Sequence, residues 1–249
     1  MIIEDDILVL KETKYKDNDK ILQALSRNNG KLQILARGCR KNKSPLVNIA
    51  QIMSLSKATL YDNRDMYLVN SAELINSFYN IRNNLTAFMY GSYVLELLNY
   101  VSQESQVDSK VFDMTVKLLV IFNLSDNEAD NIPKLVSMYE LKLISMLGFK
   151  PELTACIECG APVTKDGIFI FNYLEGGLQC CQCNVNALKN KFKIENALVL
   201  DEIIKAKFED EGIYPKITKE VSNIIRNYLF TQIGRSNFTT LNMIEAGIY

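Results

Sequence analysis

Four cysteines in two Cys-x-x-Cys pairs constrain this chain more than any other feature of its sequence. The first pair is Cys156 and Cys159, and the second is Cys180 and Cys183, with twenty residues between the pairs. Two thiolates separated by two residues can turn toward one ion from a tight knuckle, and two knuckles supply the tetrahedral sulfur shell that zinc prefers. The spacing therefore predicts one structural Zn²⁺ ion held by these four side chains.

The residues around the pairs favour a zinc ribbon. Residues 168–171 are typical of a short strand, and Glu175-Gly176-Gly177 is typical of a turn before the second knuckle. Cys181 competes with Cys180, but Cys181-x-Cys183 is tighter than the usual knuckle, so we predict Cys180 as the third ligand. Two alternatives stay open: a thiol oxidoreductase using Cys156 and Cys159, and a disulfide framework, which needs an oxidising compartment.

The absence of histidine narrows the chemistry of this chain. Histidine is the commonest acid–base group near neutral pH, and catalytic zinc sites usually use it while leaving one coordination position open. A zinc ion with four thiolates is closed and therefore structural. The sequence also lacks a phosphate-binding loop and a nucleophile elbow. We expect no enzyme activity and no catalytic residues.

Length and composition indicate a globular, multidomain protein. The chain has 249 residues, of which 48% are hydrophobic, and this is enough for two or three small domains. The start, Met1-Ile2-Ile3-Glu4-Asp5-Asp6, is acidic and unlike a signal peptide, and no apolar run approaches the roughly 18 residues that span a bilayer. We therefore expect a cytoplasmic protein that does not bind membranes.

The net charge is only −1, but the charges are unevenly distributed. Between Lys20 and Tyr61 there are eight basic residues and no acidic residue. Such a segment can neutralise phosphates and displace their counterions, although a solvated basic loop would have the same composition. The candidate DNA-binding residues are Arg27, Lys31, Arg37, Arg40, Lys41 and Lys43, with Arg64, Arg82, Arg226 and Arg235 as possible extensions.

The first eighty residues read as five short strands separated by turns. The expected strands are residues 7–10, 20–25, 31–36, 51–61 and 65–69, with turns at Asp17-Asn18, Asn28-Asn29-Gly30 and Asp62-Asn63. Five strands in about seventy residues suggest a small barrel such as the oligonucleotide-binding (OB) fold, whose groove combines cations with aromatic faces. Tyr15, Tyr61 and Tyr67 are candidates for stacking on bases, although aromatic residues in strands more often pack in the core.

From about residue 81 the apolar residues recur with helical spacing. Helices are expected at residues 85–100, 111–122 and 135–146, with Pro133 near the start of the third and Gly148 after its end. Residues 197–208 and 217–233 also read as amphipathic helices. The predicted class is α+β and multidomain: an OB-fold barrel at 1–80, a helical domain at 81–150, a zinc module at 151–190, and C-terminal helices at 191–249 that pack on the helical domain.

A series of short motifs runs through the chain: Leu10-Lys11, Asn18-Asp19-Lys20-Ile21-Leu22, Gly30-Lys31, Ala36-Arg37-Gly38, Arg40, Ser44, Leu60-Tyr61, Glu73, Ser92-Tyr93, Glu96-Leu97, Cys156-x-x-Cys159-Gly160, Phe169, Gly177, Cys180-x-x-Cys183 and Gly234-Arg235. No single motif is decisive, but their order and intervals are specific. Together they resemble the RecO family of bacterial recombination mediators, and the resemblance runs nearly end to end.

The resemblance implies a DNA-repair protein rather than an enzyme. It implies binding of single- and double-stranded DNA, annealing of complementary strands, association with RecR, and loading of RecA onto strands coated with single-stranded DNA-binding protein. It also implies a structural zinc ion and a bacterial, nucleoid-associated protein. Members of the family are often more basic than this chain.

One other function remains compatible with the same folds. A barrel with a zinc ribbon also occurs in RNA-binding and transcription-related modules, and fold does not fix function. Contacts to the 2′-hydroxyl of RNA would distinguish that function. The sequence leaves open the oligomeric state and the surfaces that meet RecR and the single-stranded DNA-binding protein.

Overall fold

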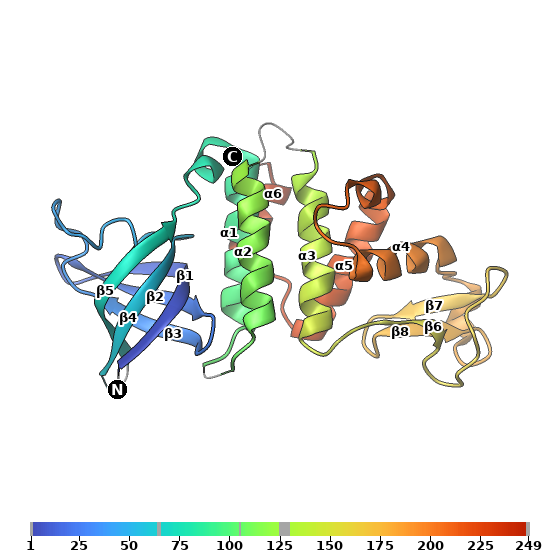
Figure 1. The fold of residues 1–249 in the computed structure, drawn as a ribbon. Coiled ribbons are helices and arrows are strands. Elements are labelled where there is room, and N and C mark those ends of the chain that lie inside the picture. The colour runs from blue at the N-terminus through green and yellow to red at the C-terminus, as the bar shows by residue number, and fades with distance from the viewer. Residues whose placement is uncertain (1, 64–65, 105, 125–129, 248–249) are drawn as a thin grey trace. The chain divides into compact units, whose positions relative to one another are not determined.

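The computed structural model describes residues 2–63, 66–104, 106–124 and 130–247 and divides the chain into two compact units (Figure 1). Unit 1 consists of residues 1–129 together with 237–249, and unit 2 consists of residues 130–236. The segment that completes unit 1 therefore follows unit 2 in the sequence.

A closed five-stranded barrel forms the N-terminal part of unit 1 (Figure 1). Its strands pair in the order β1-β2-β3-β5-β4, and the pair β3–β5 is parallel while the others are antiparallel. Alternate residues of each strand fill the interior, among them Leu22, Ile34 and Leu60. The strands are β1 (Ile2–Tyr15), β2 (Asp19–Ser26), β3 (Gly30–Ala36), β4 (Leu55–Asn63) and β5 (Met66–Asn76).

The five predicted strands are confirmed, but β1 and β5 extend well beyond their predicted bounds, and β4 begins at Leu55 rather than at residue 51 because residues 51–54 form a turn. β1 begins at Ile2 because its acidic start pairs with β4, and it continues to Tyr15 because its exposed second half pairs with β2. β5 extends to Asn76 along β4, and Asp65, its predicted first residue, lies outside the described residues. Most residues of these extensions are polar and backbone pairing holds them in the sheet, so apolar periodicity alone did not show them.

A buried carboxylate, Asp5 on β1, fixes the turn between β2 and β3. It accepts hydrogen bonds from the Ser26 hydroxyl, from the main-chain and side-chain nitrogens of Asn28 at 2.9 and 2.8 Å, and from Asn29 Nδ2 at 2.7 Å. Burial alone would raise the pKa of Asp5, but these hydrogen bonds outweigh it and hold the pKa below its ordinary value. The predicted turn at Asn28-Asn29-Gly30 is thus anchored to β1.

Replacing Asp5 with asparagine should destabilise unit 1 at neutral pH by about 1–3 kcal/mol, because an amide cannot accept all of these hydrogen bonds. A depressed folded-state pKa stabilises the protein above the unfolded-state pKa, and this stabilisation is lost as the pH falls through the folded-state value. The difference between wild type and Asp5→Asn should therefore shrink below about pH 4. Urea denaturation between pH 7 and pH 3 measures the free energy of unfolding of both proteins. A difference that does not change with pH would contradict this role of the Asp5 carboxylate. Asp6→Asn, one residue along, is the matched control.

Helices complete unit 1. α1 (Leu85–Val101) packs against β1 and β2, and η1 (Tyr79–Asn83), α2 (Ser109–Leu124) and α6 (Thr239–Glu245) contact α1 or α2. The carboxylate of Glu96 on α1 accepts hydrogen bonds from the main-chain nitrogens of Thr239 and Thr240, both at 3.0 Å, at the start of α6. The sequence analysis did not identify α6, because seven residues are too short for a helical period to be evident.

Unit 2 combines three helices with a small sheet. α3 (Ile132–Met146) packs against α4 (Ile194–Lys205) and α5 (Lys219–Ile233), and the sheet order is β6-β8-β7. The strands are β6 (Glu152–Cys156), β7 (Phe169–Asn172) and β8 (Gly177–Cys180), with short 3-10 helices η2 (Val185–Leu188) and η3 (Glu211–Lys216). As predicted, Pro133 lies in the first turn of α3 and Gly148, with φ 98°, follows its end.

One ion pair lies inside the helical packing of unit 2. The Glu140 side chain on α3 is fully buried, and Arg226 Nε on α5 donates to its Oε1 at 3.3 Å. Arg226 itself is only 18% exposed. A buried carboxylate is costly without a partner, so this pair fixes how α5 packs on α3.

The architecture confirms the predicted α+β class with an N-terminal barrel, a helical part and a cysteine-bearing ribbon beside the C-terminal helices. The division at residues 80, 150 and 190 stays a prediction. In the part of the chain that the structure describes, no helix combines the length and apolarity needed to cross a membrane.

Candidate nucleic-acid interface and metal centre

A basic face lies at one end of the barrel, where the β1–β2 turn meets the connection that follows β3. Because Lys20 pairs with Ala36, the start of β2 lies beside the end of β3. Arg37 and Lys41 line an open depression of about 450 Å³ together with Lys16, which directly follows β1. Lys43 lies in the same connection and is exposed. We call Lys16, Arg37, Lys41 and Lys43 the basic face.

Hydrogen bonds anchor the connection after β3, which carries three residues of the basic face, to the start of β2 and the β1–β2 turn. Gly38, with φ 65°, donates its main-chain N–H to Asp19 Oδ1 at 2.7 Å. Arg40 is tied to the β1–β2 turn, because its guanidinium donates to the carbonyl of Asp17 at 2.9 Å and its main-chain nitrogen to that of Asn18 at 3.0 Å. No ion pair joins the four cations of the basic face to a carboxylate among the described residues. Asp17 and Asp19 also line the depression, so two carboxylates lie near these cations without forming ion pairs with them.

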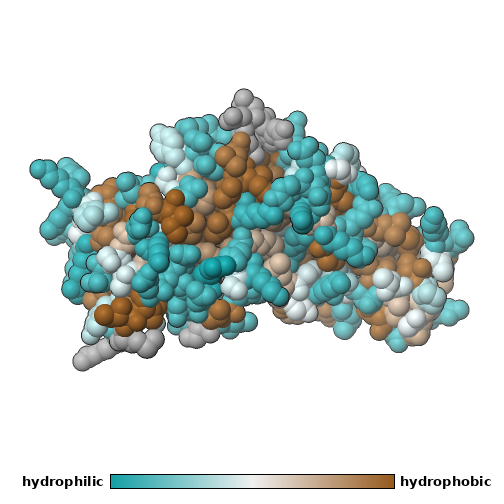
Figure 2. All heavy atoms as spheres, viewed as in Figure 1, coloured by the Kyte–Doolittle hydropathy of each residue, from teal (hydrophilic) through white to brown (hydrophobic). Residues whose placement is uncertain are grey.

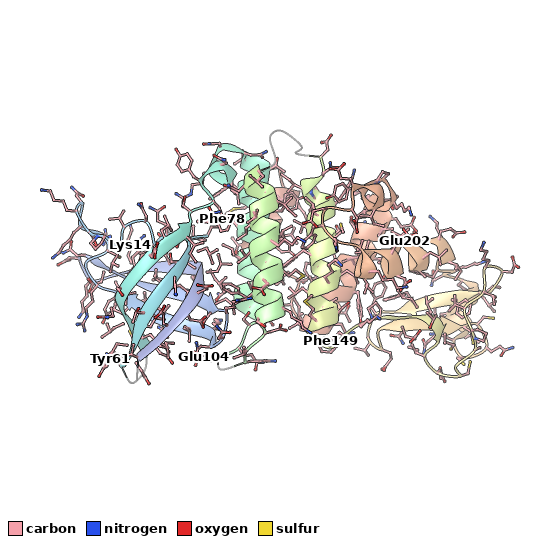
Figure 3. All side chains as sticks on the ribbon, in the orientation of Figure 1. Lys14, Tyr61, Phe78, Glu104, Phe149 and Glu202 are labelled. Atoms are coloured by element: carbon pink, nitrogen blue, oxygen red, sulfur yellow. The ribbon has the colours of Figure 1, made fainter. Side chains whose placement is uncertain are left out.

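Arg27 and Lys31 differ from the other candidate DNA-binding residues because both have partners within unit 1. Arg27 makes a two-pronged ion pair with Asp113 on α2, with both N–O distances at 2.9 Å. Lys31 donates to the carbonyl of Asn99 at 2.6 Å, and burial lowers its pKa. Both side chains connect the barrel to the helices of unit 1, and Glu104, labelled in Figure 3, forms an isolated bridge with Lys31.

The four possible basic extensions are scattered. Arg64 lies outside the described residues, and Arg82 donates to a main-chain carbonyl at 3.5 Å. Arg226 is paired with Glu140, and Arg235 lines a separate depression in unit 2. Neither arginine of unit 2 therefore belongs to the basic face.

The ribbon of unit 2 brings four cysteine sulfurs together. The Sγ atoms of Cys156, Cys159, Cys180 and Cys183 all lie within 4.8 Å of one another, and those of Cys159 and Cys180 are 3.7 Å apart. Zinc–sulfur bonds of 2.3 Å in a tetrahedron place the sulfurs about 3.8 Å apart. The donor set and its spacing fit one tetrahedral metal ion.

Strand pairing explains why the two knuckles meet. β6 and β8 run parallel, so Cys156 and Cys180, the last residues of these strands, lie at the same end of the sheet. Each knuckle then turns back on its first cysteine: Gly160 N donates to the Cys156 carbonyl at 2.9 Å, and Cys183 N to the Cys180 carbonyl at 3.1 Å. Gly160 has a φ of 73°, which favours glycine at this turn.

The electrostatics of the four thiols suit a cation. Burial would raise the pKa of Cys156, but main-chain N–H groups of Cys159, Cys180 and Glu158 outweigh it and lower the pKa to about 6. The pKa of Cys183 is raised, first by hydrogen bonding with Cys159 and then by burial and the other two thiols. One thiolate thus suppresses ionisation of the next because their negative charges repel each other. A bound divalent cation would offset this charge repulsion.

Cys181 lies outside this group of four. Its main-chain nitrogen donates to the carbonyl of Ile168 at 3.0 Å, which joins the second knuckle to the residue before β7. The structure therefore brings Cys180 to the other three cysteines in the register that the sequence favours.

Two family models match the chain, one after the other. The model described as Recombination protein O N terminal matches residues 1–78, and that described as Recombination protein O C terminal matches residues 82–241. This chain belongs to the RecO family.

Relatives named DNA repair protein RecO match nearly the whole chain. The protein from Alkaliphilus metalliredigens is 30% identical over 98% of this chain and 99% of its own length. The protein from Acetivibrio thermocellus is 30% identical over 96% of this chain and 94% of its own length. The match of the N-terminal model to the barrel and of the C-terminal model to the remainder confirms the resemblance seen in the sequence.

One residue of the RecO basic face was missed by the sequence analysis. Lys16 was not selected because it precedes the acid-free segment and is followed by Asp17. The predicted Asp17-Asn18 turn was the available signal, since the antiparallel β2–β3 pair places the start of β2 beside Arg37 and the turn brings Lys16 to the same depression. A count of charges along the sequence ignores this register.

Proposed function

We propose that this RecO family member binds single- and double-stranded DNA on the basic face of its barrel and anneals complementary strands. The observation that carries the proposal is the cluster of Lys16, Arg37, Lys41 and Lys43, whose charges are not neutralised by ion pairs in the described part of the chain. Cations arranged in this way bind phosphates, release counterions and tolerate any base sequence. When cations screen the phosphate charges of two complementary strands, the strands repel each other less and can align their bases.

The family supports a wider role in repair. With RecR, the protein would promote loading of RecA onto strands coated with single-stranded DNA-binding protein, as a DNA-associated component of the bacterial cytoplasm. The role is binding rather than catalysis, which is consistent with a chain that lacks histidine. The four clustered thiols support zinc as the structural metal, because closed sites of four cysteines are typical of zinc ribbons.

Replacing Arg37, Lys41 and Lys43 together with alanine should weaken binding to DNA and lower its dependence on salt. For a single strand the slope of log affinity against log salt concentration should fall by about 2, since each lost phosphate contact contributes about 0.7. Fluorescence anisotropy across a salt series measures the slope, and annealing of oligonucleotides coated with single-stranded DNA-binding protein measures the function.

The matched control replaces three exposed lysines of unit 2, Lys165, Lys189 and Lys191, and changes the net charge equally. It should leave the affinity and the slope close to wild type. Equal losses in the two triple variants would contradict a localised interface. A wild-type protein that accelerates no annealing and prefers RNA would instead favour an RNA-binding module.

A further inference from the structure

One cysteine of the clustered four is open to solvent. Cys159 is exposed, whereas Cys156 and Cys180 are buried and Cys181 and Cys183 are half-buried. Figure 2 shows hydrophobic residues reaching the surface where Figure 1 labels the strands of the ribbon. A small oxidant dissolved in water therefore reaches Cys159 more readily than the two buried cysteines.

A buried sulfur lies directly beside this exposed one. The Sγ atoms of Cys159 and Cys180 are 3.7 Å apart, and Cys180 comes from the end of β8 rather than from the first knuckle. A disulfide bond is about 2.0 Å long, so a shift of less than about 2 Å joins the two sulfurs. Rotation of the two short side chains can supply a shift of this size.

The other cysteine of the first knuckle is less free to form a bond with Cys159. Cys156 is buried, and its Sγ accepts a hydrogen bond from the main-chain nitrogen of Cys180 at 3.3 Å. Turning that sulfur toward Cys159 would disturb this hydrogen bond inside the ribbon, at a cost in free energy. Cys180 is therefore the partner that the geometry favours.

Exposure and ionisation together decide which cysteines are oxidised. A thiolate that solvent reaches reacts with peroxides, whereas a buried structural thiol is inert. A cysteine that binds a metal ion is deprotonated. As the exposed member of the cluster, Cys159 thus combines the two properties of an oxidation-sensitive cysteine.

We propose that Cys159 is a site of reversible oxidation by hydrogen peroxide, and that it then forms a disulfide bond with Cys180 and so releases the metal from the ribbon. This inference rests on the proposed zinc ion. It goes beyond nucleic-acid binding, because it assigns to unit 2 a response to oxidants.

Two steps give the disulfide, and their atoms and electrons balance. In the first, the Cys159 thiolate attacks hydrogen peroxide, the O–O bond breaks, one oxygen forms a sulfenic acid on Cys159, and the other leaves as hydroxide. In the second, the Cys180 thiolate attacks the Cys159 sulfur, the S–S bond forms, and the S–O bond breaks with loss of a second hydroxide. Two protons from solvent convert the hydroxides to water, and the two sulfurs together lose two electrons to the peroxide.

The disulfide removes two of the four ligands at once. Cys156 and Cys183 remain, and two thiolates do not close a tetrahedral zinc site. The new bond also joins the first knuckle to the second, so the four cysteines stay near one another after the metal has left. Reduction by a dithiol in the presence of zinc should therefore restore the site.

Two histidine variants separate the oxidised position from metal binding. Histidine is a zinc ligand in sites of three cysteines and one histidine, but it cannot form a disulfide. Cys159→His should therefore keep one zinc ion and lose the reactive thiol. Cys183→His is the matched control, because it makes the same exchange at another ligand and leaves Cys159 and Cys180 in place. Cys181→Ser removes the neighbouring thiol outside the cluster.

The experiment exposes each protein to a series of hydrogen peroxide concentrations after its zinc content has been measured. A chromogenic chelator reports the rate of zinc release, and mass spectrometry of peptides identifies the disulfide. Wild type should release one zinc ion per chain as a bond between Cys159 and Cys180 appears. Cys183→His and Cys181→Ser should release zinc at the wild-type rate, and Cys159→His about tenfold more slowly.

Four results would overturn the inference. If wild type contains zinc that peroxide does not release, the cluster is inert while the proposed metal stands. If Cys159→His releases zinc as fast as wild type, Cys159 is not the oxidised position. A disulfide between other cysteines of wild type, which the mapping detects without any substitution, would show that the pairing is wrong. If untreated wild type contains no zinc, the proposed metal and the inference both fail.

Discussion

Cys156→Ser is expected to abolish metal binding and unfold the ribbon of unit 2. A serine hydroxyl is a poor zinc ligand, and the remaining three thiols cannot close a tetrahedral site. Metal binding contributes about 10–16 kcal/mol in zinc-finger peptides, which is more than a small sheet obtains from its own core. Elemental analysis should show the loss of one zinc ion per chain, and hydrogen exchange should show loss of protection in β6, β7 and β8.

Cys181→Ser is the matched control for this prediction, because Cys181 neighbours the cluster without belonging to it. This variant should keep one zinc ion and the protection of the ribbon. If Cys181→Ser loses the metal while Cys180→Ser retains it, the assigned register is wrong. Oligonucleotide binding by Cys156→Ser should persist, because the basic face belongs to unit 1.

Arg226→Ala is expected to destabilise unit 2 by about 3–5 kcal/mol, because it leaves the fully buried Glu140 carboxylate without its charged partner. The loss should be concentrated where α5 packs on α3. Urea denaturation measures the free energy of unfolding, and hydrogen exchange of the α3 and α5 amides locates the change. Removing both charges in Glu140→Leu with Arg226→Met should recover most of the stability.

An exposed ion pair provides the comparison for Arg226. Lys205 and Asp201 lie one turn apart on α4 with an N–O distance of 2.5 Å, and the Lys205 side chain is 71% exposed. Lys205→Ala should change the stability by about 0.5 kcal/mol or less. A similar loss in both variants would mean that burial does not strengthen the role of Arg226.

The cysteine cluster could be predicted from the sequence because its geometry is almost wholly local. Each Cys-x-x-Cys pair fixes its own turn, so only the meeting of the pairs depends on the sheet. The barrel was also predictable, since each strand has enough apolar residues to fill one layer of the core. By contrast, the pairing of Glu140 with Arg226 joins residues far apart in the sequence and has no local pattern.

The candidate DNA-binding residues were harder to choose because a count of charges ignores the partners of each side chain. Arg27 and Lys31 contribute to the acid-free segment, yet they contact Asp113 and Asn99 in the helices that follow the barrel. Tyr67, a candidate for base stacking, is partly buried and packs against the barrel core. These outcomes depend on strand register and on tertiary contacts, which composition does not encode.

The return of α6 to unit 1 has a consequence for biosynthesis. A ribosome completes residues 130–236 before it reaches Thr239 and Thr240, whose main-chain N–H groups donate hydrogen bonds to the Glu96 carboxylate. Unit 2 can therefore acquire its native contacts while one face of α1 still lacks its last helix. A nascent chain that ends before Thr239 would contain all four clustered cysteines of unit 2 but would lack the last helix of unit 1. Complete folding of unit 1 therefore requires translation to pass Glu245.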